Sequence, residues 1–173
     1  KEDFYQSIGE VSHVSLVPTQ LQRWFDYLAE HPQSIQTKAV LLGGTQIPVK
    51  LTQALSELGI RSYSGYGMTE MASTAFAKQS DGKIGVGQAL LGREFKLVNE
   101  EVWLKGAGLA MGYWRDGCVD PLTNAEGWFQ SKDKGQWLDN ELVIQGRLDN
   151  MFISGGENIQ PEEIEKVIAQ SDL

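Results

Sequence analysis

The chain has 173 residues, of which 41% are hydrophobic and 22% charged, and its formal net charge is -8 at pH 7. This composition supports a packed core and excludes wholesale disorder. The acidic balance argues against non-specific nucleic-acid binding, which needs a basic surface. It leaves room for a phosphate-bearing small ligand, because backbone N–H groups and one or two cations can hold phosphate locally.

A single cysteine, Cys118, rules out an intrachain disulfide and fits a reducing compartment, so we expect a cytoplasmic protein. No apolar run approaches the ~18 residues of a transmembrane helix and no signal peptide opens the chain, so we expect no membrane insertion. The sequence starts abruptly at Lys1, and its last helix pattern is cut short at Leu173. We therefore expect a fragment of a longer protein.

Strand and helix patterns alternate in the first part of the chain. The expected strands cover residues 13–17, 39–42 and 60–63, and the expected helices between them run from Thr19 to Leu28 and from Pro48 to Gly59. Thr19 is expected to be the N-cap of the first helix. This order of elements predicts a parallel sheet with covering helices.

The pattern changes near Gln79 to short, paired strands with frequent glycine. Residues 95–98 and 101–104 predict a hairpin around Asn99-Glu100, and a helix is predicted to begin at Pro161. We expect an α/β chain in three parts: a piece of a large parallel α/β domain, a small antiparallel β-barrel or curled sheet, and a hinge that opens an α+β C-terminal domain. The expected bounds are 1–78, 79–146 and 147–173.

Two glycine-rich stretches, Gly43-Gly44-Thr45 and Ser64–Gly67, each follow a predicted strand. Ligands bind at that edge of parallel sheets, and glycine lets a ring or a phosphate approach the backbone. Tyr66 then offers a face for a base, Thr69 can donate to phosphate, and Glu70 can hold Mg²⁺. The alternative is a glycine turn into a helix, with Thr69 as N-cap and Glu70 favoured by the helix dipole.

Three charged residues in the second half have similar alternatives. Asp133 is either a solvated loop carboxylate or an acceptor for a ribose diol, and Arg147 is either a surface charge or a phosphate ligand. Asp149 is by default a turn former. No zinc-type ligand spacing is present, and Cys118 has no neighbouring base to activate it.

Taken in order along the chain, these segments resemble the ANL superfamily of adenylate-forming enzymes, in its acyl-CoA synthetase branch. The resembling segments are GGT at 43–45, SGYGMTE at 64–70, EVWLKG at 101–106 with GYW at 112–114, GWFQSKD at 127–133, and GRLDNMFISGGENIQPEEIE at 146–165. Residues 15–20, 38–44 and 153–165 are most similar to the aryl-CoA ligases of menaquinone synthesis, whose acid substrate is 2-succinylbenzoate.

The resemblance implies a role for each matching residue. The expected contacts of adenine, adenylate and acyl group are Gly43, Gly44, Thr45, Ser64, Gly65, Tyr66 and Gly67. Thr69 would bind phosphate and Glu70 would hold Mg²⁺, which makes these two the expected catalytic residues. Asp133 would hold the ribose hydroxyls, and Arg147 would reach ribose and phosphate.

The remaining expected roles concern the acyl group and CoA. Ser15 would contact the acyl substrate, and Asp149 would be the hinge about which the C-terminal domain turns. The loop expected to face CoA comprises Ser154, Gly155, Gly156 and Glu157. The resemblance implies that ATP, Mg²⁺, CoA and an aryl acid bind to the protein. It leaves open whether the protein forms a homo-oligomer.

The sequence also departs from the superfamily pattern. Lys132 stands where relatives usually have glycine. The superfamily's phosphate loop and catalytic lysine are expected outside this sequence, so we expect these residues alone to be inactive. The rival interpretations are another aryl-CoA ligase, an adenylation domain that loads a carrier protein, and a nucleotide-binding module without catalysis.

Overall fold

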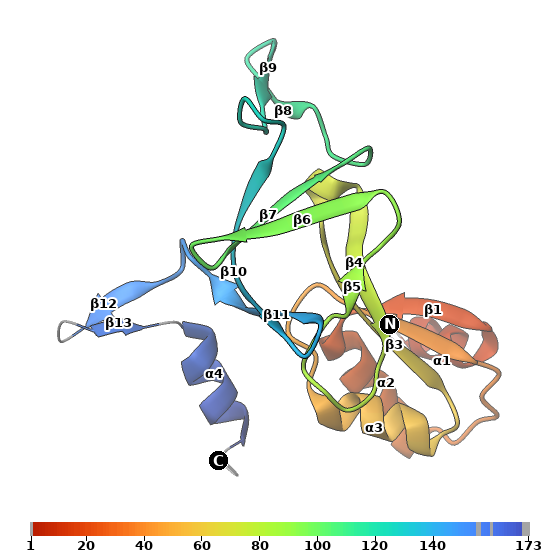
Figure 1. The fold of residues 1–173 in the computed structure, drawn as a ribbon. Helices are drawn as coiled ribbons and strands as arrows, with labels where there is room; N and C mark the ends of the chain where they lie inside the picture. Colours follow the sequence, from red (N-terminus) through yellow and green to blue (C-terminus); the bar gives the residue numbers. More distant parts are fainter. Residues whose placement is uncertain (1, 155–156, 160, 171–173) are drawn as a thin grey trace. The chain divides into compact units, whose positions relative to one another are not determined.

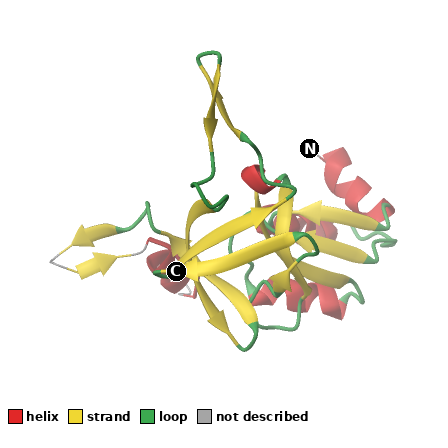
Figure 2. Cartoon of the chain, turned by 45° about the horizontal axis from the view of Figure 1, so that its top comes forward, coloured by secondary structure: helices red, strands yellow, loops and turns green. Residues whose placement is uncertain are grey.

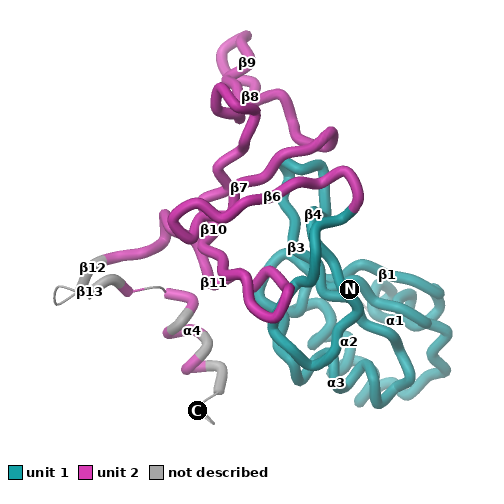
Figure 3. Tube along the Cα trace, in the orientation of Figure 1, with its two compact units in different colours: residues 1–90 teal, residues 91–173 magenta. Residues whose placement is uncertain are grey.

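The computed structural model describes residues 2–154, 157–159 and 161–170. The chain divides into two compact units, residues 1–90 and 91–173 (Figure 3). Helices are concentrated in the first unit, whereas the second consists mostly of strands (Figure 2). The three-part division expected from the sequence stays a prediction. None of the helices in the described ranges is long and apolar enough to cross a membrane.

Unit 1 is a five-stranded mixed sheet with helices packed on it (Figure 1). Its elements are α1 (Glu2–Glu10), β1 (His13–Leu16), α2 (Pro18–Glu30), β2 (Ala39–Leu42), α3 (Val49–Glu57), β3 (Arg61–Met68), the 3₁₀ turn η1 (Thr69–Met71), β4 (Ser73–Gln79) and β5 (Gln88–Ala89). The strand order is β1-β2-β3-β4-β5. The first three strands are parallel, as predicted, and the last two add antiparallel pairings that were not predicted.

The core of unit 1 lies between the parallel strands and the helices. Leu21 and Trp24 of α2 and Leu55 of α3 are fully buried beside Val40 and Leu42 of β2. Each such side chain stabilises the fold by roughly 1.5–3 kcal/mol relative to exposure. Leu21, Trp24 and Leu28 of α2 are spaced by three and four residues, so the helix presents one apolar stripe to the sheet.

The start of α2 differs from the prediction. Val17, not Thr19, is the N-cap, and Pro18 is the first helical residue. The Gln20 side chain accepts a hydrogen bond from the Val17 backbone N–H at 3.0 Å. In a capping box, this is the bond that runs from the N-cap backbone to the side chain of the third helical residue. Proline suits the first helical position because it has no N–H to satisfy there. Thr19 therefore falls inside the first turn.

The stretch Ser64–Glu70 also differs from the turn-and-helix interpretation. Ser64–Met68 continue β3 and pair antiparallel with β4, with an irregularity between Tyr66 and Gly67. A single 3₁₀ turn follows, capped by Met68, and Ala72 takes a left-handed φ of 63° to reverse the chain. The strand continues because β4 supplies partners for its backbone groups. The interpretation as a glycine turn into a helix is therefore wrong.

Unit 2 is built on an antiparallel sheet with strand order β11-β10-β7-β6. Its elements are β6 (Arg93–Val98), β7 (Glu101–Gly106), β8 (Gly112–Arg115), β9 (Cys118–Pro121), β10 (Phe129–Leu138), β11 (Glu141–Arg147), β12 (Phe152–Ser154), β13 (Glu157–Ile159) and α4 (Pro161–Gln170). Val102, Leu104 and Leu142 are fully buried in it. The predicted antiparallel character is confirmed, and the pairing corresponds to the curled-sheet alternative, with β11 and β6 at the edges.

The predicted hairpin of unit 2 is confirmed in register. Val98 pairs with Glu101, and the two turn residues, Asn99 and Glu100, have φ values of 51° and 66°. Two positive φ values in a two-residue loop are typical of a type I′ turn, whose twist matches that of the flanking strands.

The approach of β4 to β3 generates a stability prediction. A Cβ on Gly67 would lie 2.2 Å from the Ser73 carbonyl oxygen, whereas a Cβ on Gly65 would meet only side-chain methyls and one carbonyl oxygen at 3.3–3.5 Å. We expect Gly67→Ala to lower the free energy of unfolding by about 1–3 kcal/mol, and Gly65→Ala by less than about 1 kcal/mol. Urea unfolding followed by circular dichroism measures both, and equal losses would contradict the steric argument.

Candidate functional site

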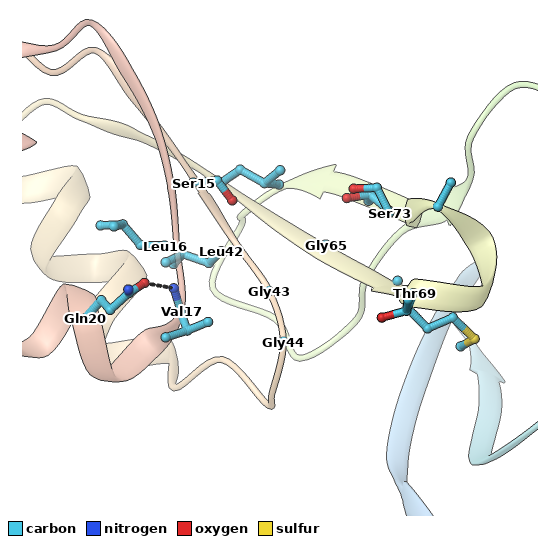
Figure 4. A pocket seen from close by; sticks show the side chains of 15 residues that line it. Ser15, Leu16, Val17, Gln20, Leu42, Gly43, Gly44, Gly65, Thr69 and Ser73 are labelled. Atoms are coloured by element: carbon cyan, nitrogen blue, oxygen red, sulfur yellow. Dashed lines mark hydrogen bonds between the residues drawn. The ribbon is translucent and has the colours of Figure 1, made fainter. Parts of the chain in front are cut away.

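An open pocket of about 480 Å³ lies in unit 1, where the carboxyl ends of β1 and β2 face the β3–η1–β4 hairpin (Figure 4). Six of the residues singled out in the sequence line it: Ser15, Gly43, Gly44, Gly65, Gly67 and Thr69. They come from β1, the loop after β2, β3 and the 3₁₀ turn. The structure thus brings together, at the predicted sheet edge, two glycine-rich stretches that lie about twenty residues apart.

One wall of the pocket is bare backbone. A Cβ on Gly43 would lie 3.2 Å from the Gly65 carbonyl oxygen, and Gly44 has a φ of 85° that favours glycine. A side chain at Gly43 would fill the gap between the loop after β2 and strand β3, and one at Gly44 would meet Val17. A flat or anionic ligand can therefore approach the backbone closely there.

Hydroxyl groups of the β3–β4 hairpin lie on the other side of the pocket. Thr69 is exposed at the start of η1, and Ser73 and Thr74 of β4 line the pocket with it (Figure 4). Ser73 and Thr74 were not singled out in the sequence. Their position depends on the reversal at Ala72, and no local motif marked that reversal.

Four other predicted residues surround the pocket without lining it. Ser64 is buried and its hydroxyl lies 2.9 Å from that of Ser80, while the Tyr66 ring packs against Phe76 with centroids 6.0 Å apart. These two side chains alternate with Gly65 and Gly67 along β3 and so belong to the opposite face of the strand. Base stacking by Tyr66 stays a prediction.

Thr45 and Glu70 each directly follow a lining residue. Thr45 is exposed next to Gly44, and Glu70 is half-buried in η1 beside Thr69. No cluster of three or more His, Cys, Asp or Glu side chains that could hold a metal occurs in the described part of the chain. One or two carboxylates together with phosphate and water is the usual arrangement for Mg²⁺.

In unit 2 the predicted ribose ligand Asp133 is held rigidly on β10. The Ser131 hydroxyl donates to the Val102 carbonyl at 2.7 Å and accepts the Asp133 N–H at 3.0 Å. Between them Lys132 has a φ of 65°, and its N–H donates to Glu101 Oε1 at 3.0 Å. The lysine thus keeps the left-handed conformation for which glycine is favoured.

Arg147 and Asp149 form an ion pair that is held by two hydrogen bonds. Arg147 donates from Nε and Nη2 to the two oxygens of Asp149, each at 2.8 Å, and from Nη1 to Asp133 Oδ1 at 3.4 Å. These hydrogen bonds from the guanidinium lower the pKa of the Asp149 carboxyl below its usual value. The structure therefore joins three residues that the sequence analysis had given separate roles.

The expected CoA-side loop is described only in part. Ser154 and Glu157 pair in the β12–β13 hairpin. Gly155 and Gly156 lie outside the described residues.

The ion pair of Arg147 generates a titration prediction. Arg147→Gln removes the charge that stabilises the Asp149 carboxylate, so we expect the pKa of Asp149 to rise toward its usual value. Side-chain carboxyl ¹³C NMR against pH measures it. The pKa of Asp81 is lowered by Lys78 in unit 1, so it should not change in the same spectra. An unchanged Asp149 midpoint would show that Arg147 is not the cause.

Comparisons with known proteins identify the family of the chain. Residues 6–114 match the family described as "AMP-binding enzyme". The chain is 68% identical over 171 residues to the 2-succinylbenzoate–CoA ligase of Haemophilus influenzae, covering 98% of this chain and 38% of the relative. The chain therefore spans well under half of that protein's length.

Two solved structures have the same fold. One is an Escherichia coli MenE variant with bound OSB-AMS, at 52% identity and a TM-score of 0.90, covering 99% of this chain and 38% of that one. The other is the o-succinylbenzoate coenzyme A synthetase of Bacillus subtilis in complex with ATP and magnesium ion, at 28% identity and a TM-score of 0.80, covering 97% and 38%. The acyl-CoA synthetase-like α/β fold expected from the sequence is confirmed, and the chain belongs to the AMP-binding enzyme family.

Proposed function

We propose that this chain is part of an AMP-forming acid–CoA ligase that converts 2-succinylbenzoate into 2-succinylbenzoyl-CoA for menaquinone synthesis. The observation that carries the proposal is the 68% identity, over nearly the whole chain, to a ligase of that name. The glycine-walled pocket with Thr69 at its rim supports the same activity, because an adenylate needs both a close backbone and phosphate donors.

The proposed reaction has two steps. The substrate carboxylate attacks the α-phosphate of ATP, forms the acyl–phosphate bond and expels pyrophosphate. The thiol of CoA, losing its proton, then attacks the acyl carbon and displaces AMP. In both steps the protein positions the reacting groups and neutralises developing charge.

The residues of unit 1 would hold the adenylate and acyl group. The exposed Thr69 hydroxyl would donate to a phosphate oxygen, and Gly43, Gly44 and Gly65 would leave room for the flat groups. Ser15, which also lines the pocket, would contact the acyl group. Glu70 is partly shielded and next to Thr69, which suits a carboxylate that holds Mg²⁺. When bound, that ion neutralises phosphate charge.

The residues of unit 2 would bind the ribose and reorient the C-terminal domain, which would act as a lid. Asp133 would accept hydrogen bonds from the ribose hydroxyls, and Arg147 would donate hydrogen bonds to the ribose and the phosphate. Asp149 would be the hinge, and the loop from Ser154 to Glu157 would face CoA in the second step. The two steps need different groups at the adenylate, so a hinged lid suits the chemistry.

The test of the proposed activity uses the full-length protein. AMP release is measured with ATP, Mg²⁺ and CoA in the presence of 2-succinylbenzoate, benzoate or no acid. We expect activity with 2-succinylbenzoate that depends on CoA. Release with benzoate alone would favour another aryl-CoA ligase, and release that needs a carrier protein instead of CoA would favour a loading domain.

The role of Glu70 gives a mutational prediction. Glu70→Ala should lower the rate of ATP–pyrophosphate exchange by about a hundredfold or more, because a charge-stabilising group is lost. Glu57→Ala, at an exposed acid at the end of α3, is the matched control and should leave the rate unchanged. Exchange that survives Glu70→Ala would remove Glu70 from the machinery.

The hinge gives a second prediction. Asp149→Pro fixes φ near -65° and should block thioester formation while adenylation continues. Asp149→Asn keeps the backbone rotation and is the matched control for the lost carboxylate. Pyrophosphate exchange and single-turnover reaction of the adenylate with CoA measure the two steps separately. Equal loss of both steps in the proline variant would contradict a hinge at this position.

A further inference from the structure

The guanidinium of Arg147 is already engaged by side chains of its own unit. The edge formed by Nε and Nη2 faces both oxygens of Asp149 at 2.8 Å, and Nη1 lies 3.4 Å from Asp133. This paired arrangement on one edge is the geometry in which arginine binds a phosphate. A nucleotide phosphate and Asp149 would therefore need the same two donors.

Asp133 and Asp149 differ in how easily a ligand can displace them from Arg147. Asp133 is paired with Arg147 in the β10–β11 register and its side chain is only 11% exposed, whereas that of Asp149 is 51% exposed. Asp149 lies beyond the end of β11, in a segment where Leu148 N–H donates to Lys132 and Asn150 N–H donates to Arg147. Asp133 is thus a fixed partner and Asp149 a surface partner that water or a ligand can reach.

The charges around Arg147 also favour competition between Asp149 and a phosphate. Arg147 faces the carboxylates of Asp133 and Asp149, and the charge of Lys132 also acts on Asp149. The Arg147 hydrogen bonds lower the pKa of Asp149, which keeps that carboxylate ionised at neutral pH. A phosphate that approaches the Nε and Nη2 edge of Arg147 is repelled by the Asp149 carboxylate unless Asp149 moves away.

We propose that Asp149 is an internal stand-in for the nucleotide phosphate: it holds Arg147 before the ligand binds and must release it when the ligand arrives. The inference rests on the proposed function, which brings Arg147 to the nucleotide. It goes further because it makes the hinge residue a competitor of the ligand. By reciprocity, a nucleotide that takes Arg147 frees Asp149, so binding and hinge release are coupled.

The first test measures AMP binding to the full-length protein by isothermal titration calorimetry. Asp149→Asn removes the competing charge and should tighten AMP binding by about twofold to fivefold, the size expected for an exposed ion pair. Asp139→Asn is the matched control, an exposed acid in the β10–β11 turn that makes the same charge change, and should leave the affinity unchanged. Equal or weaker binding by Asp149→Asn would overturn the proposal.

A second readout does not depend on AMP. The Arg147 Nε–H signal in ¹⁵N NMR, assigned with Arg147→Gln, should exchange slowly with water in the wild type and several-fold faster in Asp149→Asn. Equal exchange would show that Asp149 does not hold the arginine. If exchange accelerates as expected but the wild type binds no AMP, the proposed function fails and the stand-in role fails with it, while the ion pair itself is upheld.

Discussion

The pocket depends on one close backbone approach, that of β4 to β3 at Gly67. The Ser73 carbonyl oxygen occupies the space that any side chain at this position would take. Because the strands can come this close, η1 and Ala72 reverse the chain within a few residues and place Thr69, Ser73 and Thr74 on the pocket. A bulkier residue would push β4 away and remove the hydroxyl-bearing side of the site.

In unit 2 the corresponding constraint is electrostatic. Asp133 is fixed by Ser131 and by the left-handed turn at Lys132, and it faces Arg147 across the β10–β11 pair. Arg147 extends this arrangement to Asp149, so the sheet, the arginine and the start of the proposed hinge are linked by hydrogen bonds. A ligand that competed for the arginine would thereby act on the proposed hinge segment, without any long pathway through the core.

Local patterns predicted the elements whose partners are near in sequence or whose apolar residues are regular. The strands β1 and β2, the helices α2 and α3, and the β6–β7 hairpin belong to this group. Local sequence patterns did not predict α1, β4 or the β8–β9 hairpin. The strand signal of β4 was masked by its small and polar residues, and pairing with β3 decides its conformation.

The sequence by itself determined that the glycine-rich stretch at 43–45 follows a strand, and that the order of its motifs along the chain resembles an adenylate-forming enzyme. Only the tertiary structure decided that SGYGMTE continues a strand instead of turning into a helix, because a partner strand satisfies its backbone groups. It also decided that Arg147 and Asp149 form one ion pair. The distance between two charged side chains depends on the turn that follows β11, and residue type alone does not fix that turn.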